Sequence, residues 1–240
     1  MSAPRGEFSS KLGFLMAAAG SAVGLGNIWG FPTQVAGNGG AAFLLVYLVL
    51  MFCLAYPALM AELIIGRHAK ANSVEALRSI AGSSTTARVG ALTGFVGLIT
   101  ACMILGFYSI LAGWMLSHTL ASAAEFLGLA RVSEWFATHS IARSLPFTAI
   151  FMALTIAIIG GGVKDGIDKW CSRLMPSLLV VLVLLIGYVL TLDGSNDGVK
   201  AYLVPDFERL TNPKLIIGAM GQAFFSLSLG VGTMLIYGSY

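Results

Sequence analysis

The sequence predicts an all-α integral membrane protein with six transmembrane helices, and three observations lead to this fold class. First, 57% of its 240 residues are hydrophobic and only 10% are charged, whereas soluble domains carry about 25% charged residues. Second, the mean hydropathy is +0.86, so polar groups are too few to cover a surface in water. Third, six stretches are long enough to cross a bilayer core, which takes about 20 mainly apolar residues per helix.

The six apolar stretches follow one another along the chain with no soluble domain between them. They run over residues 12–37, 41–66, 89–123, 145–162, 167–192 and 215–240. We therefore expect a single transmembrane domain over residues 1–240. The first stretch follows Arg5 and Lys11, a pattern shared with cleavable signal peptides. Because the apolar character continues past Ala22, a first membrane helix that stays attached is the simpler interpretation.

The distribution of positive charge predicts the orientation of the helices. With a cytoplasmic N-terminus, nine cations lie inside: Arg5, Lys11, Arg67, Lys70, Arg78, Arg88, Lys164, Lys169 and Arg173. Five lie outside: Arg131, Arg143, Lys200, Arg209 and Lys214. This excess follows the positive-inside rule and predicts a multi-pass protein of the plasma or inner membrane.

Several functional classes find no support in the sequence. A net charge of +3 without a basic patch interleaved with aromatics gives no indication of nucleic-acid binding. Cys53, Cys102 and Cys171 are far apart and lack a metal-ligand spacing, so we expect small apolar side chains. There is no GxSxG, no HExxH and no pair of mid-membrane carboxylates, which argues against an intramembrane enzyme. "GLGN" lacks the spacing of a dinucleotide motif, and we assign no ligand role to the three histidines, His68, His118 and His139.

The first apolar stretch contains a segment that is unfavourable for a continuous helix. Gly20 to Pro32 reads "GSAVGLGNIWGFP", and its glycines permit unusual backbone conformations. A bare backbone group in hydrocarbon costs several kcal/mol, so a broken helix needs something that satisfies its ends. Freed carbonyl groups suit a cation, and the N–H groups of the following half-helix suit an anion. We therefore predict that Ser21–Gly26 binds a cation and a carboxylate together.

The sixth apolar stretch contains a similar segment, "GQAFFSLSLGVG", from Gly221 to Gly232. Near its middle lie Ser226, Ser228, Gly230 and Gly232. Either segment alone is also compatible with helix packing through small residues. Two interrupted helices five spans apart are the pattern of an inverted-repeat transporter, so we favour a binding site.

Four segments of the chain resemble the neurotransmitter:sodium symporter family, in its bacterial amino acid transporter branch. They are "AGSAVGLGNIWGFP", "NGGAAFLLVYL", "PALMAELIIGR" and "GQAFFSLSLGVG". The resemblance implies the inverted-repeat fold of the bacterial leucine transporter, with helices 1 and 6 broken at mid-membrane. It further implies a first five-helix repeat at about residues 8–192, followed by helix 6 at about residues 214–240. The second half of the family fold would be absent from these 240 residues.

For sodium, the resemblance implies ligands at both breaks. The first ion would be held by Ala22, Asn27 and Ser226, the last of which replaces the usual threonine and keeps its hydroxyl. The second ion would be held by the carbonyl groups of Gly20 and Val23. Sodium is thus the expected ion, while its stoichiometry and any dependence on chloride stay open.

For substrate, the resemblance implies an amino acid. Gly24 stands where monoamine transporters of the family carry aspartate, and it leaves room for a substrate carboxylate. The expected carboxylate donors are Leu25, Gly26 and Tyr108. The expected ammonium contacts are Ala22, Phe225, Ser226 and Ser228. The expected side-chain contacts are Ile104, Tyr108, Phe225 and Val231, with Phe224 as an aromatic lid.

Two positions depart from the family pattern. Gly30 replaces the arginine of the usual outer gate, so outer closure must differ. Val231 replaces a common phenylalanine, and we hypothesise a roomier pocket that accepts a larger substrate side chain.

Three further features of the sequence leave alternatives open. Glu62 is a functional candidate because it is ionisable within a span, or it pairs with Arg67. Gln222 either lines the outer vestibule or bonds to backbone. Gly166 and Pro176 either allow the fifth helix to unwind during inward sodium release, as the resemblance implies, or mark an ordinary kink.

The leading hypothesis is sodium-coupled symport of an amino acid, with this chain as the N-terminal half of the transporter. The alternative is a truncated, non-transporting fragment or a regulatory half that needs another chain. The expected partners are an amino acid, the lipid bilayer, and either a homo-oligomer or a missing C-terminal half.

Overall fold

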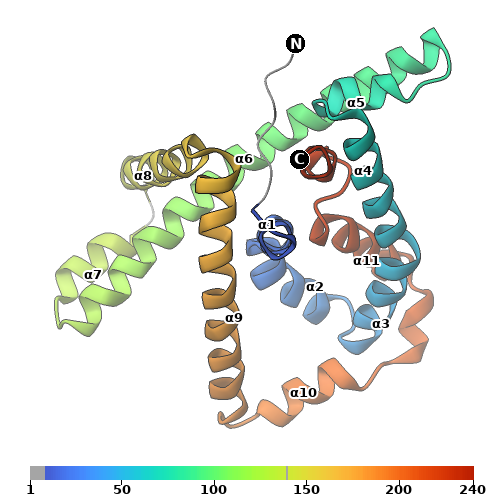
Figure 1. Cartoon of the computed structure of the whole chain (residues 1–240). Helices are drawn as coiled ribbons and strands as arrows, with labels where there is room; N and C mark the ends of the chain where they lie inside the picture. Colours follow the sequence, from blue (N-terminus) through green and yellow to red (C-terminus); the bar gives the residue numbers. More distant parts are fainter. Residues whose placement is uncertain (1–8, 139) are drawn as a thin grey trace. The chain divides into compact units, whose positions relative to one another are not determined.

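The computed structural model describes residues 9–138 and 140–240, and every regular element among them is a helix (Figure 1). The predicted all-α fold class is therefore confirmed. Two residues that the sequence analysis considered, Arg5 and His139, lie outside the described residues.

Each of the six predicted spans corresponds to one helix or to a short series of helices. The first contains α1 (Lys11–Ala22), the π-helical turn η1 (Gly26–Gly30) and α2 (Phe31–Gly37); the second contains α3 (Ala41–Leu50), η2 (Met51–Ala55) and α4 (Tyr56–Ala69). The third is α6 (Ser84–Phe126), and the fourth is α8 (Ile141–Gly160). The fifth contains η3 (Gly162–Asp168) and α9 (Lys169–Leu190), and the sixth contains α11 (Pro213–Ser226) and α12 (Thr233–Gly238).

Four of the described helices are long and apolar enough to cross a membrane: Ala41–Ala69, Ser84–Phe126, Ile141–Gly160 and Gly162–Leu190. The first span adds a fifth if its two parts, which are bent by 56°, count as one. In the sixth span, residues 227–232 separate two helices that are each too short to cross alone. Both spans that were predicted to be broken are therefore the ones that the structure divides.

The structure also contains short helices that the sequence analysis did not predict. They are α5 (Ser73–Ser79), α7 (Ala130–Ala137), α10 (Ser195–Leu203) and the 3₁₀ turn η4 (Phe207–Thr211). Local caps help to form them: the Asn72 side chain accepts a hydrogen bond from the backbone of Glu75, and the Asp206 side chain accepts one from that of Glu208. They are too short to register in a search for stretches of membrane length.

Two compact units make up the chain: Met1–Leu98 with Asp168–Tyr240, and Ile99–Ile167. In the second unit, Trp114 of α6 donates a hydrogen bond of 2.9 Å to Ser144 of α8. Gly113 lies so close to Thr148 that an added Cβ would be 2.8 Å from its backbone nitrogen. Glycine thus lets α6 and α8 approach closely.

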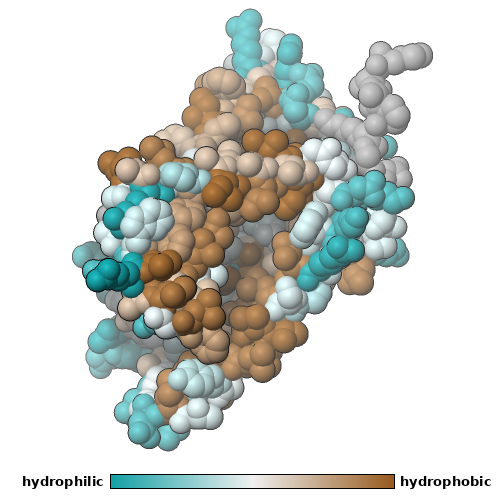
Figure 2. All heavy atoms as spheres, turned by 90° about the vertical axis from the view of Figure 1, so that its left-hand side faces the viewer, coloured by the Kyte–Doolittle hydropathy of each residue, from teal (hydrophilic) through white to brown (hydrophobic). Residues whose placement is uncertain are grey.

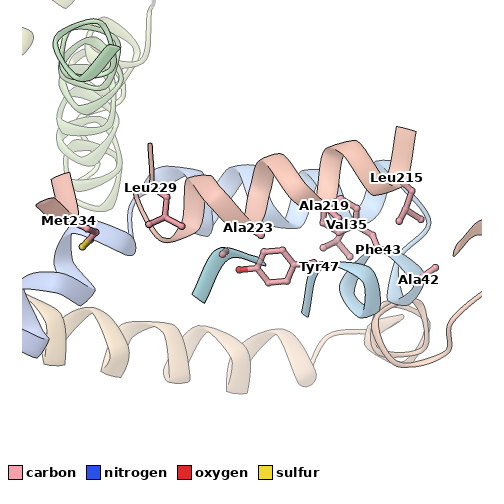
Figure 3. Packing of buried hydrophobic residues seen from close by; sticks show 10 residues of the cluster. Val35, Ala42, Phe43, Tyr47, Leu215, Ala219, Ala223, Leu229 and Met234 are labelled. Carbon is pink, nitrogen blue, oxygen red and sulfur yellow. The ribbon is translucent and has the colours of Figure 1, made fainter. Parts of the chain in front are cut away.

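The core of the first unit lies where α11 packs on α3 (Figure 3). Leu215, Ala219 and Ala223 are buried and repeat every four residues, which places them on one face of α11. They pack against Phe43 and Tyr47 of α3, which are also buried. The core therefore fixes α11, which leads into the second break.

Large apolar side chains are exposed over much of the chain, and brown residues cover much of the face in Figure 2. In Gly162–Leu190, none of the most apolar window is buried. Leu184, for example, is 68% exposed. A helix of this kind is stable in hydrocarbon rather than in water.

Candidate functional site

The first break begins where α1 ends at Ala22. Val23 takes an extended conformation, with φ −88° and ψ 93°. Helical bonding resumes when the backbone N–H groups of Asn27 and Ile28 donate to the Gly24 carbonyl, at 2.9 and 3.0 Å. The carbonyls of the last turn of α1 consequently lack some of their usual helical partners.

The second break follows Ser226, the last residue of α11, and its backbone is irregular for longer. Ser228, Gly230 and Gly232 have positive φ angles of 53°, 82° and 82°. Glycine adopts such angles freely, whereas serine does so at a cost of about 1–2 kcal/mol. The positive φ angles therefore explain why "SLGVG" contains two glycines. The helix α12 begins directly after this segment.

Side chains of both breaks satisfy freed carbonyls of the first break. The Asn27 amide Nδ2 donates to the Ala22 carbonyl at 2.5 Å. The Ser228 hydroxyl donates to the Ser21 carbonyl at 3.0 Å, from a position 207 residues further along the chain. The two breaks thus form one polar centre in the first unit.

This centre brings together the three residues that were predicted to hold the first sodium. The Ser226 hydroxyl donates to the Asn27 side-chain oxygen at 2.6 Å, and the Asn27 nitrogen bonds to the Ala22 carbonyl. Carbonyl, amide and hydroxyl oxygens are the donors that a hard cation prefers. The donor set present in the structure therefore fits sodium.

The carbonyls predicted for a second sodium belong to the same end of α1. Gly20 and Val23 are half-buried, and an added Cβ at Gly20 would be 3.2 Å from the Cys171 sulfur of α9. Gly20 therefore lies on the face of α1 that packs on α9. The second ion stays a prediction.

Gln222 belongs to the polar centre, and the sequence analysis had left its role open. It is buried in α11, and its Nε2 lies 3.3 Å from each of three oxygens: Gly26 O, Asn27 Oδ1 and Ser226 Oγ. Of the two alternatives, bonding to backbone is therefore observed, together with two side-chain contacts. Gln222 precedes Ser226 by four residues, so both lie on one helix face. This spacing is the feature of the sequence that could have assigned Gln222 to the site.

The predicted substrate residues of the first unit lie around the same breaks. An added Cβ at Gly26 would overlap the Phe225 ring, so glycine is required for this contact. Leu25 and Gly26 begin the half-helix after the break, where the first N–H groups precede helical bonding. Phe225 is 43% exposed, whereas Phe224 packs against the hydrophobic core.

The remaining predicted substrate residues are Val231, inside the second break, and two residues of the second unit. Val231 lies near α6, because its backbone is 3.4 Å from an added Cβ at Gly97. Ile104 and Tyr108 belong to the second unit, where Tyr108 stacks edge-to-face on Phe107 at 5.9 Å. Their part in the site stays a prediction.

Glu62 of α4 contacts the second break rather than Arg67. Its Oε1 accepts a hydrogen bond of 2.8 Å from the Gly230 backbone. Its other oxygen, Oε2, is buried without a hydrogen-bond partner. Within residues 9–138 and 140–240 no ion pair joins Glu62 to Arg67, so the proposed pairing was wrong. The carboxylate instead accepts from a backbone N–H of the second break, which would be costly to leave without a partner in a membrane.

Asp168, at the start of α9, was missed by the sequence analysis. It is 3% exposed and accepts hydrogen bonds from the Ser9 backbone at 2.9 Å and from the Ser9 hydroxyl. An added Cβ at Gly13 would overlap its carboxylate. Asp168 therefore fixes the beginning of α1 against α9. Just before it, Gly166 lies in the widened helical segment η3 and Pro176 lies inside α9; unwinding there stays a prediction.

Comparison with known proteins relates the chain to sodium-dependent transporters. The sequence model described as "Sodium:neurotransmitter symporter family" matches residues 5–146 and 139–240. The sodium-dependent transporter YhdH of Bacillus subtilis (strain 168) is 41% identical over 239 residues, which is 98% of this chain and 52% of YhdH. The sodium-dependent neutral amino acid transporter B(0)AT2 of Bos taurus is 28% identical, over 98% of this chain and 36% of that protein.

Among solved structures, MhsT in complex with L-phenylalanine matches with a TM-score of 0.79 and 38% identity. The match covers 99% of this chain and 54% of the MhsT chain. The chain thus spans about half the length of YhdH and of the MhsT chain.

Proposed function

Since the chain belongs to the sodium:neurotransmitter symporter family, we propose that it takes part in sodium-coupled symport of an amino acid, as the N-terminal half of the transporter. The observation that carries the proposal is the polar centre joining Ala22, Asn27 and Ser226 across the two breaks. It presents oxygens of three kinds at the point where two spanning helices are interrupted. Such a set of oxygens suits a small hard cation.

Sodium would act as the driving ion. One elementary charge moving across the membrane is worth about 2.3 kcal/mol per 100 mV, which is enough to concentrate a substrate. Asn27 would turn its oxygen toward the ion, and Ser226 would turn its hydroxyl lone pair to the same place. The hydrogen bonds that now join these groups would be exchanged for ion contacts. Sodium binding would thereby hold the two broken helices together.

The substrate we propose is a neutral amino acid with a large side chain. Gly24 leaves space beside the break for a carboxylate, and Val231 is smaller than phenylalanine. B(0)AT2 is a neutral amino acid transporter and MhsT was solved with L-phenylalanine, which supports this class. A preference for glycine or alanine over leucine, phenylalanine or tryptophan in uptake competition would contradict it.

The wider arrangement follows from the same proposal. We place the N-terminus in the cytoplasm and the protein in the plasma or inner membrane, without enzymatic activity. Residues 8–192 would form the first repeat, and residues 214–240 would begin the second. The alternative is a half that does not transport until another chain supplies the remaining helices.

The test is sodium-dependent amino acid uptake into proteoliposomes. Asn27→Ala removes the amide that bonds to Ala22 and Ser226, and we expect the sodium dissociation constant to rise at least about tenfold, or about 1.4 kcal/mol. Asn38→Ala is the matched control, because Asn38 is a half-buried asparagine just after α2 whose amide bonds to Gln34, away from the polar centre. Equal sodium affinity in the two variants would exclude the proposed site. Sodium-dependent uptake by the 240-residue chain alone would exclude the non-transporting alternative.

A further inference from the structure

A cavity of the first unit is lined by none of the residues of the polar centre. It has a volume of about 580 Å³ and lies between the start of α1, the end of α4 and the end of α12. In Figure 1 these elements are found near the label C and along α4. Nothing in the proposed transport cycle uses this cavity.

The charge of the cavity lining is one-sided. Lys11 of α1, Arg67 of α4 and Lys70 just after α4 all line it, and no acidic side chain does so among the described residues. None of these three cations forms an ion pair with a described residue. All three are exposed. Three cations around one cavity raise the local concentration of an anion.

The remainder of the lining is apolar. Phe14 of α1 and Leu63 and Ile64 of α4 face the cavity beside the cations. Ile64 is 61% exposed, as is usual for a side chain that contacts hydrocarbon. An occupant of this cavity therefore needs a negative head and an apolar body, which a soluble phosphate lacks.

We propose that this cavity binds the headgroup of an anionic phospholipid. Lys11, Arg67 and Lys70 lie on the side that the positive-inside rule assigns to the cytoplasm, where anionic lipids attract basic residues. Basic pockets between transmembrane helices on that side are suited to such headgroups. A phosphodiester seated here contacts Lys11 on α1 and Arg67 on α4 together. The lipid thereby links the first half of a broken span to an unbroken one.

The test is native mass spectrometry of the purified protein in mixed micelles of phosphatidylglycerol and phosphatidylcholine. We expect phosphatidylglycerol to be retained at least about tenfold more strongly than phosphatidylcholine. Each basic residue near the membrane surface contributes about fivefold to the affinity for an anionic lipid. The triple variant Lys11→Gln, Arg67→Gln, Lys70→Gln should therefore bind phosphatidylglycerol about a hundredfold more weakly. The readout does not depend on transport, so it fails or succeeds independently of the proposed symport.

Two control variants separate the site from general charge and from misfolding. Lys164→Gln, Lys169→Gln, Arg173→Gln removes the same charge from the same predicted side, and binding should change less than about threefold. Lys11→Arg, Arg67→Lys, Lys70→Arg keeps the charge and should keep the binding. An equal loss in the first control, or a full loss in the second, would overturn the proposal. So would unchanged binding in the cavity variant, or displacement of the lipid by inorganic phosphate alone.

Discussion

The two breaks in the spanning helices are held open by different means. In the first, the backbone is irregular only around Val23 and Gly24, and the side chain of Asn27 caps the freed carbonyl of Ala22. In the second, residues 227–232 are all non-helical, three of them have positive φ, and Glu62 of another span anchors Gly230. The first break is thus capped by its own Asn27, with one further bond from Ser228 to the Ser21 carbonyl. The second is held by backbone conformation and by a carboxylate from another helix.

This difference indicates which of the two depends on the rest of the fold. The cap on the Ala22 carbonyl comes from the same segment, whereas the anchor on the Gly230 N–H is lost when Glu62 of α4 is altered. The polar centre requires both, because Ser226 and Asn27 come from different breaks. We therefore expect substitutions that disturb the second break to disturb the polar centre as well.

The largest expected effect comes from removing the anchor of the second break. Glu62→Ala leaves the Gly230 N–H without its charged acceptor, and a hydrogen bond to a charged group contributes about 1.5–3 kcal/mol. We expect a loss of that size in stability, measured by unfolding in detergent, together with weaker sodium binding. Glu75→Ala is the control, because its contact with Arg78 is an exposed pair at 3.8 Å and such pairs contribute less than about 1 kcal/mol. Equal losses would mean that Glu62 does not anchor the break.

A smaller effect is expected from crowding the first break. Gly26→Ala places a methyl group into the Phe225 ring, and overpacking of this kind costs about 1–3 kcal/mol. Substrate affinity should fall more than global stability, since Phe225 is partly exposed and can turn away. The double variant Gly26→Ala, Phe225→Leu should recover part of the stability in the same unfolding measurement. No recovery would show that the ring contact is not the cause.

The smallest expected effect isolates backbone conformation at the second break. Gly230→Ala meets no neighbouring atom within 4 Å, so its cost arises from a φ of 82° alone, about 1–2 kcal/mol. Gly221→Ala is matched to it, because Gly221 also has open space but lies inside α11. There alanine should be neutral or stabilising, by up to about 1 kcal/mol. A shift of the same sign in both thermal unfolding midpoints would contradict this account.

Much of the architecture could be predicted from local sequence pattern. Apolar length is a local property, and the expected spans fall on helices of the structure. The two breaks were also predictable, because Gly24, Gly230 and Gly232 lower the stability of a continuous helix and permit other backbone conformations. Short polar helices such as α5 and α10 were missed, since they carry no membrane-length pattern.

The contacts between residues far apart in the chain could not be predicted from local sequence pattern. Gln222 and Asn27 are 195 residues apart, Gly230 and Glu62 are 168 apart, and Ser9 and Asp168 are 159 apart. A polar residue in an apolar helix shows that a partner is needed, because a bare polar group in hydrocarbon is costly. Which residue serves as that partner depends on how the helices pack, and for this reason Glu62 was matched to the nearby Arg67 instead of Gly230.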